Sequence, residues 1–139
     1  MQVFIDSNFW IALCSPNDTL HKKSRAIARR LKHERADLVT SSDVIAETVT
    51  VLSMRAGRKI AIAAGELLVA NPMLEIVHIE EELYLRAWDI FRATSKKDVG
   101  FVDCSILAVL QTMMIPTLVT FDCDLAHFAV KQHVETVTT

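Results

Sequence analysis

Four acidic side chains stand at positions from which they could bind one metal ion together. Asp6 and Asp122 each follow a short apolar run, Glu47 lies beside the apolar stripe of a predicted helix, and Asp103 lies in the first turn of another. Taken singly, each has an ordinary explanation as a turn residue, a partly exposed helix acid or a helix-start acid. Their joint placement is what suggests a shared site.

The chemistry of such a site follows from its charge. An acid near a buried face is costly unless it is paired or bound to a cation. Carboxylates and water favour Mg²⁺ or Mn²⁺, whereas zinc prefers His or Cys. An ion held in this way activates water and stabilises the charge that develops on a phosphate. We therefore predict a phosphodiester hydrolase with Asp6, Glu47, Asp103 and Asp122 as its metal-binding and catalytic residues.

The elements that must position these acids alternate along the chain. Short apolar strands are expected at 3–5, 37–40, 74–78 and 116–120, with a weak fifth at 133–137. Helices are expected at about 9–13, 18–33, 42–56, 59–70, 80–94, 102–114 and 122–128. This alternation predicts an α/β three-layer sandwich, in which helices flank a central parallel sheet of four to five strands. Ligands bind at the carboxyl ends of such strands, where Asp6 and Asp122 lie.

Residues at the ends of the expected helices agree with this reading. Asn17 or Asp18 is expected to cap the second helix, and Ser41 or Ser42 the third, which should stop at Gly57. The chain shows no internal repeat or linker, so residues 1–139 are expected to form a single domain.

The charge distribution adds a candidate RNA-binding surface. A net charge of -2 argues against a general nucleic-acid binder, but seven of the 15 Lys and Arg residues fall between Lys22 and Arg35. A solvated helix face explains that run equally well on its own, and only a neighbouring acidic metal site makes it informative. The RNA-binding candidates are Lys22, Lys23, Arg25, Arg29, Arg55, Arg58 and Lys59.

Several other classes of protein fit poorly. The three cysteines form no CxxC pair, which disfavours a disulfide framework or a zinc site, and each is expected to be a small buried residue. The five histidines are scattered without metal-ligand spacing, and no GxSxG, P-loop or GxGxxG motif is present. With no apolar run of about 20 residues and no signal peptide at the start, the expected location is cytoplasmic, without a membrane.

Four short segments in order carry a family resemblance. Residues 4–8, 44–47, 101–104 and 120–122 resemble the PIN domain in the style of VapC toxins, across essentially the whole chain. The resemblance implies a Mg²⁺- or Mn²⁺-dependent endoribonuclease acting on RNA, often a homodimeric toxin that a cognate antitoxin holds inactive. By this resemblance Asp6, Glu47, Asp103 and Asp122 are the metal-binding acids, and Ser7, Asn8 and Thr120 are supporting polar residues.

Three details near these acids stay open at the level of sequence. Asp98 is either a supporting acid or a solvated loop charge, and Asp124 is either an outer ligand or a surface residue. Many relatives carry a small hydroxyl residue ahead of the third acid, where this chain has Gly100, Phe101 and Val102. Weaker capping of that helix is therefore expected, which makes the placement of Asp103 less definite.

Four alternative functions share parts of this pattern. A receiver domain also gathers acids around Mg²⁺, but its phospho-acceptor Asp ends the third strand, where this chain has Val77 and His78. A haloacid-dehalogenase-like phosphatase needs a second Asp where Asn8 stands. An RNA-processing PIN nuclease without an antitoxin, and a PIN-like module that binds RNA or protein without cleavage, both remain compatible with the sequence.

Overall fold

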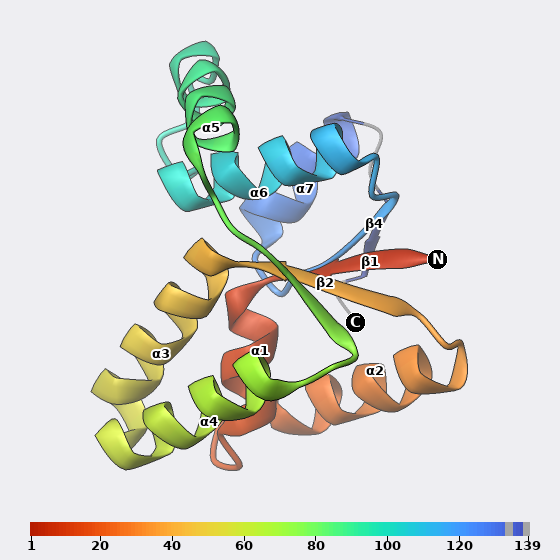
Figure 1. Ribbon diagram of the computed structural model, residues 1–139, viewed down its shortest axis with the longest axis vertical. Helices are drawn as coiled ribbons and strands as arrows, with labels where there is room; N and C mark the ends of the chain where they lie inside the picture. Colours follow the sequence, from red (N-terminus) through yellow and green to blue (C-terminus); the bar gives the residue numbers. More distant parts are fainter. Residues whose placement is uncertain (133–134, 138–139) are drawn as a thin grey trace.

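A fully parallel five-stranded sheet forms the centre of the computed structural model, which describes residues 1–132 and 135–137 (Figure 1). The strand order is β3-β2-β1-β4-β5, and each neighbouring pair is parallel. The strands are β1 (Gln2–Ile5), β2 (Asp37–Ser41), β3 (Leu74–Val77), β4 (Thr117–Val119) and β5 (Glu135–Val137). The expected parallel sheet of four to five strands is thus confirmed, and it has five.

The helices cover both faces of the sheet, which confirms the three-layer architecture. In the view of Figure 1 one set of helices lies below the sheet and another set lies above it. The lower set is α1 (Ser7–Cys14), α2 (His21–His33), α3 (Ser42–Ala56) and α4 (Arg58–Ala70). The upper set is α5 (Glu81–Ala93), α6 (Phe101–Met113) and α7 (Cys123–Lys131). None of these described helices is long and apolar enough to cross a membrane.

Burial on both faces explains the short, continuously apolar strands. Val3, Phe4 and Ile5 of β1 are fully buried, as are Leu118 and Val119 of β4. A strand that is covered by helices on both sides needs apolar side chains at successive positions rather than at alternate ones. The two strands closest to the acids are therefore held rigidly in the core.

The order of the strands places the site. The chain builds β2 and β3 on one side of β1 and then crosses to build β4 and β5 on the other. Ile5 pairs with Val119, and the backbone N–H of Asp6 donates to the carbonyl of Val119 at 3.0 Å. In open parallel sheets the crevice at such a switch point is the usual ligand site. Asp6 and Asp122 both leave the sheet at this crevice.

Most element boundaries agree with the sequence, but three local predictions were wrong. The second helix begins at His21 instead of near Asp18, because the Asp18 carboxylate accepts the backbone N–H of Leu20 at 2.8 Å in a separate turn. The first helix begins at Ser7, two residues earlier than expected, because Asp6 caps it. Cys123 is exposed rather than buried. Residues 133–134, including His133, lie outside the described residues.

The junction between α3 and α4 depends on a glycine. Gly57 has a φ of 96°, which side chains with a Cβ rarely adopt, and it lies between the last residue of α3 and the first residue of α4. The predicted stop at Gly57 is confirmed. The Oγ of Ser41 accepts the N–H of Val44 at 3.2 Å, so Ser41 rather than Ser42 caps the start of α3. Both ends of the helix that carries Glu47 are therefore set by local sequence.

Candidate active site

All four predicted acids line one hollow at the carboxyl edge of the sheet. The hollow has a volume of about 280 Å³ and is bordered by α1, α3, α6, the segment after β4 and the loop before α2. Asp6, Glu47, Asp103 and Asp122 all contribute to its wall. Side chains separated by more than one hundred positions in the sequence therefore face the same small volume.

Asp6 is the most buried of the four acids and has both carboxylate oxygens engaged. Its Oδ1 accepts the backbone N–H of Ser7 at 2.7 Å, and its Oδ2 accepts the hydroxyl of Thr120 at 2.7 Å. Only 4% of its surface is exposed. The pKa of Asp6 is raised to about 6, mainly by burial. The hydrogen bonds from Thr120 and Ser7 oppose this rise, and the charges of Glu47 and Asp122 add to it.

Asn8 and Thr120 connect the start of α1 to the end of β4. The Asn8 side chain donates from Nδ2 to the Thr120 hydroxyl at 3.2 Å and accepts the Phe121 N–H at 2.9 Å. The Thr120 hydroxyl also accepts the N–H of Asp122 at 3.0 Å. One buried hydroxyl thus contacts Asp6 and the backbone of Asp122 at the same time. The supporting positions of Asn8 and Thr120 lie directly beside the acids.

Ser7 makes the corresponding contact to Glu47. Its hydroxyl donates to Oε2 of Glu47 at 3.0 Å and lies 3.5 Å from Oδ1 of Asp6. Glu47 itself is exposed on α3. The hydroxyl of the buried Ser7 therefore orients the exposed Glu47 side chain toward the hollow.

Asp103 and Asp122 both lie at the start of a helix, so each also has the ordinary role of a helix-start acid. Oδ1 of Asp122 accepts the N–H groups of Asp124 and Leu125, at 2.9 and 3.2 Å, and caps α7. Oδ2 of Asp103 accepts the N–H of Gly100 at 3.0 Å. Gly100, the N-cap of α6, makes no side-chain cap bond, so the expected weakness of this cap is confirmed, and Asp103 is held through the N–H of Gly100 instead. Helix N-termini favour negative charge, which suits a cluster of acids.

Burial also raises the pKa of Asp103, to about 7. The N–H of Gly100 opposes this rise, and the negative charges of Asp6, Asp122 and Glu47 add to it. Among the described residues, no Lys or Arg forms an ion pair with any of the four acids. Within the described residues, no ion pair with a cation of the chain offsets the rise in the pKa of Asp6 and Asp103.

The donor set fits a hard divalent cation with water in its shell. Within the described part of the chain, no three acidic, His or Cys side chains are close enough to hold an ion by themselves. Mg²⁺ usually keeps several waters and binds to one or two carboxylates, and the hollow is large enough for a hydrated ion. Carboxylates without His or Cys match Mg²⁺ or Mn²⁺ in chemistry.

Sequence comparison identifies the family to which this arrangement belongs. The PIN domain profile matches residues 3–131, which is nearly the whole chain. The chain belongs to the PIN domain family. The "23S rRNA-specific endonuclease VapC20" of Mycobacterium tuberculosis, in strains CDC 1551 and H37Rv, is 30% identical over 123 residues, which cover 88% of this chain and 90% of the relative.

Solved structures of VapC proteins share this PIN fold. M. tuberculosis VapC20, described as a sarcin-ricin loop cleaving toxin, superposes with a TM-score of 0.80 at 27% identity, over 91% of this chain and 94% of that one. The VapBC2 complex from Rickettsia felis, bound to a promoter DNA fragment, gives a TM-score of 0.72 at 15% identity, over 99% and 98%. The second likeness supports the fold alone.

Two acids named from the sequence do not line the PIN hollow. Asp98 is exposed in the loop before α6, and Asp124 is exposed in the first turn of α7. Sequence reasoning also missed Ile11, Asp18, Leu20 and Val51 as wall residues. Val51 is four residues after Glu47, so helical periodicity was the available signal for this position. The other three lie on α1 and in the loop after it, and no sequence pattern brings them to α3.

The basic candidates are separated by the fold of this PIN domain. Arg55, on α3, lines the acidic hollow, whereas Arg58, at the start of α4, lines a different groove. The remaining candidates are exposed and line neither: Lys22, Lys23, Arg25, Arg29 and Lys59.

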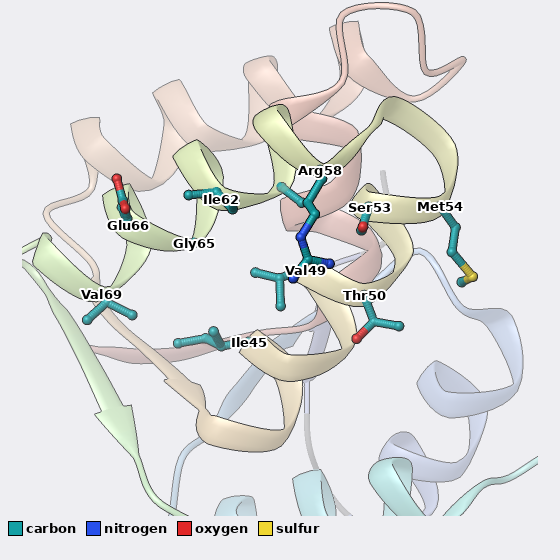
Figure 2. A pocket seen from close by; sticks show the side chains of 11 residues that line it. Ile45, Val49, Thr50, Ser53, Met54, Arg58, Ile62, Gly65, Glu66 and Val69 are labelled. Atoms are coloured by element: carbon teal, nitrogen blue, oxygen red, sulfur yellow. The ribbon is translucent and has the colours of Figure 1, made fainter.

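The groove that Arg58 lines lies between α3 and α4 and has an apolar character. Figure 2 shows Ile45 and Val49 of α3 facing Ile62, Gly65 and Val69 of α4, with Arg58 extending over the groove. Its volume is about 520 Å³. Ile62 and Val69 are 52% and 63% exposed, although such side chains are usually buried. This surface carries none of the four acids and is suited to contact with another protein.

Proposed function

We propose that this PIN protein is a metal-dependent endoribonuclease, the toxin of a toxin–antitoxin pair. The observation that carries the proposal is the convergence of four carboxylates on one hollow without a pairing cation from the described residues. Similarity to VapC20 over most of both chains supports RNA as the substrate. Because VapC20 is described as specific for 23S rRNA, ribosomal RNA is the first substrate to test.

In this proposal Asp6, Glu47, Asp103 and Asp122 hold Mg²⁺ or Mn²⁺, directly or through water. A bound ion supplies a Lewis acid that polarises the phosphate and lowers the pKa of a coordinated water. The chain's own residues orient the carboxylates: Thr120 and Ser7 donate their hydroxyl protons to Asp6 and Glu47. Asn8 supports Thr120 in turn, and Arg55 and the exposed residues of α2 contact the polyanion.

Cleavage of a defined RNA tests this proposal. A hairpin that carries the sarcin-ricin loop sequence is incubated with the protein and Mn²⁺, and products are resolved by denaturing electrophoresis. We expect cleavage that EDTA abolishes and that Asp6→Asn lowers at least a hundredfold, because asparagine keeps the helix cap but not the charge. Asp98→Asn, the matched loss of an acid outside the hollow, should cleave normally. Equal activity of Asp6→Asn and the unchanged protein would exclude the site.

The alternative functions give different results in the same assay. A PIN-like module without catalytic activity would bind RNA and leave it intact with Mn²⁺ present. An RNA-processing nuclease would cleave RNA, but its expression would not stop growth and no inhibitor would be encoded beside it. The toxin proposal requires both cleavage and growth arrest.

We also propose that α4 is covered by the cognate antitoxin. A helix with apolar side chains around most of its circumference normally lies inside a structure. Ala61, Ala64 and Leu68 of α4 are buried, yet Ile62 and Leu67, which point elsewhere, are 52% and 73% exposed. An apolar segment of a partner would bury them. The VapB partner in the R. felis complex suggests what kind of protein this is.

Co-expression with the reading frame directly upstream tests the antitoxin. We expect a stable complex that inhibits cleavage, and we expect Ile62→Glu to break the complex while the free enzyme still cleaves RNA. Val130→Glu changes a similarly exposed apolar residue, 55% exposed on α7, and should leave the complex intact. A complex that survives Ile62→Glu would place the partner elsewhere.

A homodimer and a cytoplasmic location complete the proposal. The exposed apolar side chains of α5, Tyr84, Leu85 and Phe91, are 45%, 53% and 39% exposed and offer a second contact surface for another copy. Light scattering of the free protein measures its mass, and a monomer at micromolar concentration would contradict the dimer. A ribosomal RNA substrate would place the activity in the cytoplasm.

A further inference from the structure

The acidic hollow continues beyond the acids along one face of α3. Glu47, Val51 and Arg55 follow each other at intervals of four residues and all line it. Eight residues of helix span about 12 Å, so the backbone of Arg55 lies about that far from the backbone of Glu47 along the axis. The hollow is therefore acidic at the edge of the sheet and has a positive charge at its far end.

Arg55 has no ionic partner among the described residues. Its side chain is exposed, and none of the four ion pairs includes it. The opposite wall carries Asp18, whose Oδ1 accepts the N–H of Leu20 at 2.8 Å. An arginine in the last turn of α3 also interacts favourably with the helix dipole, which is its ordinary explanation. That role does not require the side chain to line the hollow.

The surface between the two charged ends is apolar. Ile11 of α1, which is 6% exposed, and the half-buried Val51 of α3 both line this part of the hollow. The order of acids, apolar side chains and a guanidinium along the hollow matches a nucleic-acid strand with a phosphate at each end and less polar sugars between them. A guanidinium can donate two parallel hydrogen bonds to a phosphate.

We propose that Arg55 binds a second phosphate of the RNA strand, further along the strand from the scissile one, so that the strand runs from the acids along α3. This inference rests on the proposed nuclease function and adds a substrate subsite to it. The subsite fixes the register of the strand, because only one phosphate spacing brings the scissile bond to the acids while the second phosphate contacts Arg55.

A pair of neighbouring arginine variants measures the contribution of this contact. Arg55→Gln and Arg58→Gln each remove one positive charge within the same short stretch of chain, but Arg58 lines the α3–α4 groove (Figure 2). The fall in kcat/KM caused by Arg58→Gln therefore measures the general effect of removing one positive charge, and we expect it to be about twofold or less. We expect Arg55→Gln to lower kcat/KM about tenfold, mostly through KM. The slope of log affinity against log salt should fall by about 1.

Neutral phosphates along the substrate locate the contact. A series of hairpins, each with a single methylphosphonate in place of one phosphate, is cleaved by the unchanged protein and by Arg55→Gln. At one position near the cleavage site, we expect the methylphosphonate to lower kcat/KM of the unchanged protein about tenfold. The same replacement should not lower kcat/KM of Arg55→Gln any further. Arg58→Gln should remain as sensitive at that position as the unchanged protein.

The outcomes separate this inference from the nuclease proposal. If the unchanged protein does not cleave RNA with Mn²⁺, both fail. If it cleaves and Arg55→Gln behaves like Arg58→Gln at every methylphosphonate position, the subsite alone is wrong. A lower Tm for Arg55→Gln with unchanged kinetics would leave the helix dipole as the sole role of this residue.

Discussion

At the scale of single residues, one hydroxyl determines how two of the acids are held. The Thr120 hydroxyl accepts from Asn8 and from the backbone of Asp122, so both of its lone pairs are used. Its single proton is then directed at Asp6, at 2.7 Å. The hydroxyl fixes the Asp6 carboxylate as an acceptor, which is the state that a cation site requires.

Replacement of Thr120 by valine removes this hydroxyl while it preserves the shape of the side chain. The Asp122 N–H and the Asn8 amide then lose a buried acceptor, so we expect Thr120→Val to lower the free energy of unfolding by about 1–3 kcal/mol. Mn²⁺ affinity, measured by calorimetry, should also fall. Thr120→Ser keeps the hydroxyl but loses the methyl group. Compared with Thr120→Val, it should recover the Mn²⁺ affinity more completely than the free energy of unfolding. Normal Mn²⁺ affinity in Thr120→Val would show that the hydroxyl does not orient Asp6.

At the scale of elements, the packing of α3 against α4 determines where Glu47 and Arg55 are presented. These two helices are joined only by Gly57 and face each other closely at Gly65 (Figure 2). A Cβ added to Gly65 would lie 2.9 Å from Cγ1 of Val49. The glycine therefore permits a close approach that alanine would prevent.

Gly65→Ala tests this contact. Two effects of opposite sign on the free energy of unfolding compete in this variant. Alanine in a helix interior is favoured over glycine by about 1 kcal/mol. The overlap with Val49, whose χ1 is restricted in a helix, costs about 1–3 kcal/mol. We expect a net destabilisation of about 1 kcal/mol in urea unfolding.

Removal of the opposing methyl groups provides the control for that substitution. In a Val49→Ala background the added Cβ meets no valine methyl, so Gly65→Ala should become stabilising. If Gly65→Ala stabilises the protein in both backgrounds, the close packing of α3 and α4 at this point is not needed.

At the scale of the whole molecule, the acid cluster opposes folding when no metal is bound. Asp6 has a pKa of about 6 in the folded protein against an ordinary value of 3.8, and Asp103 has one of about 7. The folded state therefore binds protons more tightly than the unfolded state. The resulting stability is fully present below pH 3.8 and is lost as the pH rises through about 6 to 7.

Relative to Asp6→Asn, the stability of the metal-free protein should thus fall from about pH 4 to about pH 6, because this comparison isolates Asp6. A shift of about two pKa units corresponds to about 3 kcal/mol for Asp6. Urea unfolding in EDTA at several pH values measures this difference. Added Mn²⁺ should restore the loss above pH 7 and have little effect at pH 5, where protons occupy the site. An equal effect of Mn²⁺ at both pH values would contradict the assignment of the acids as ligands.

Sequence alone indicated the elements of the fold and the acids of the candidate site. Continuous apolar runs predict buried parallel strands, helical periodicity predicts the helices between them, and carboxylates without His or Cys partners favour a hard cation. These signals are local, because they depend on residues within one or two turns of each other. The family resemblance of the four acidic segments belongs to the same level, and the PIN match over residues 3–131 confirms it.

Tertiary structure decided which of the candidates meet. The pairing of β1 with β4 brings Asn8 to Thr120 across 112 positions, while Asp98 remains exposed, although it is only five residues from Asp103. Arg55 and Arg58 are almost adjacent in the chain and line different hollows because α3 ends between them. Such contacts depend on strand order and on the direction of each helix face, and burial of the core as a whole determines both.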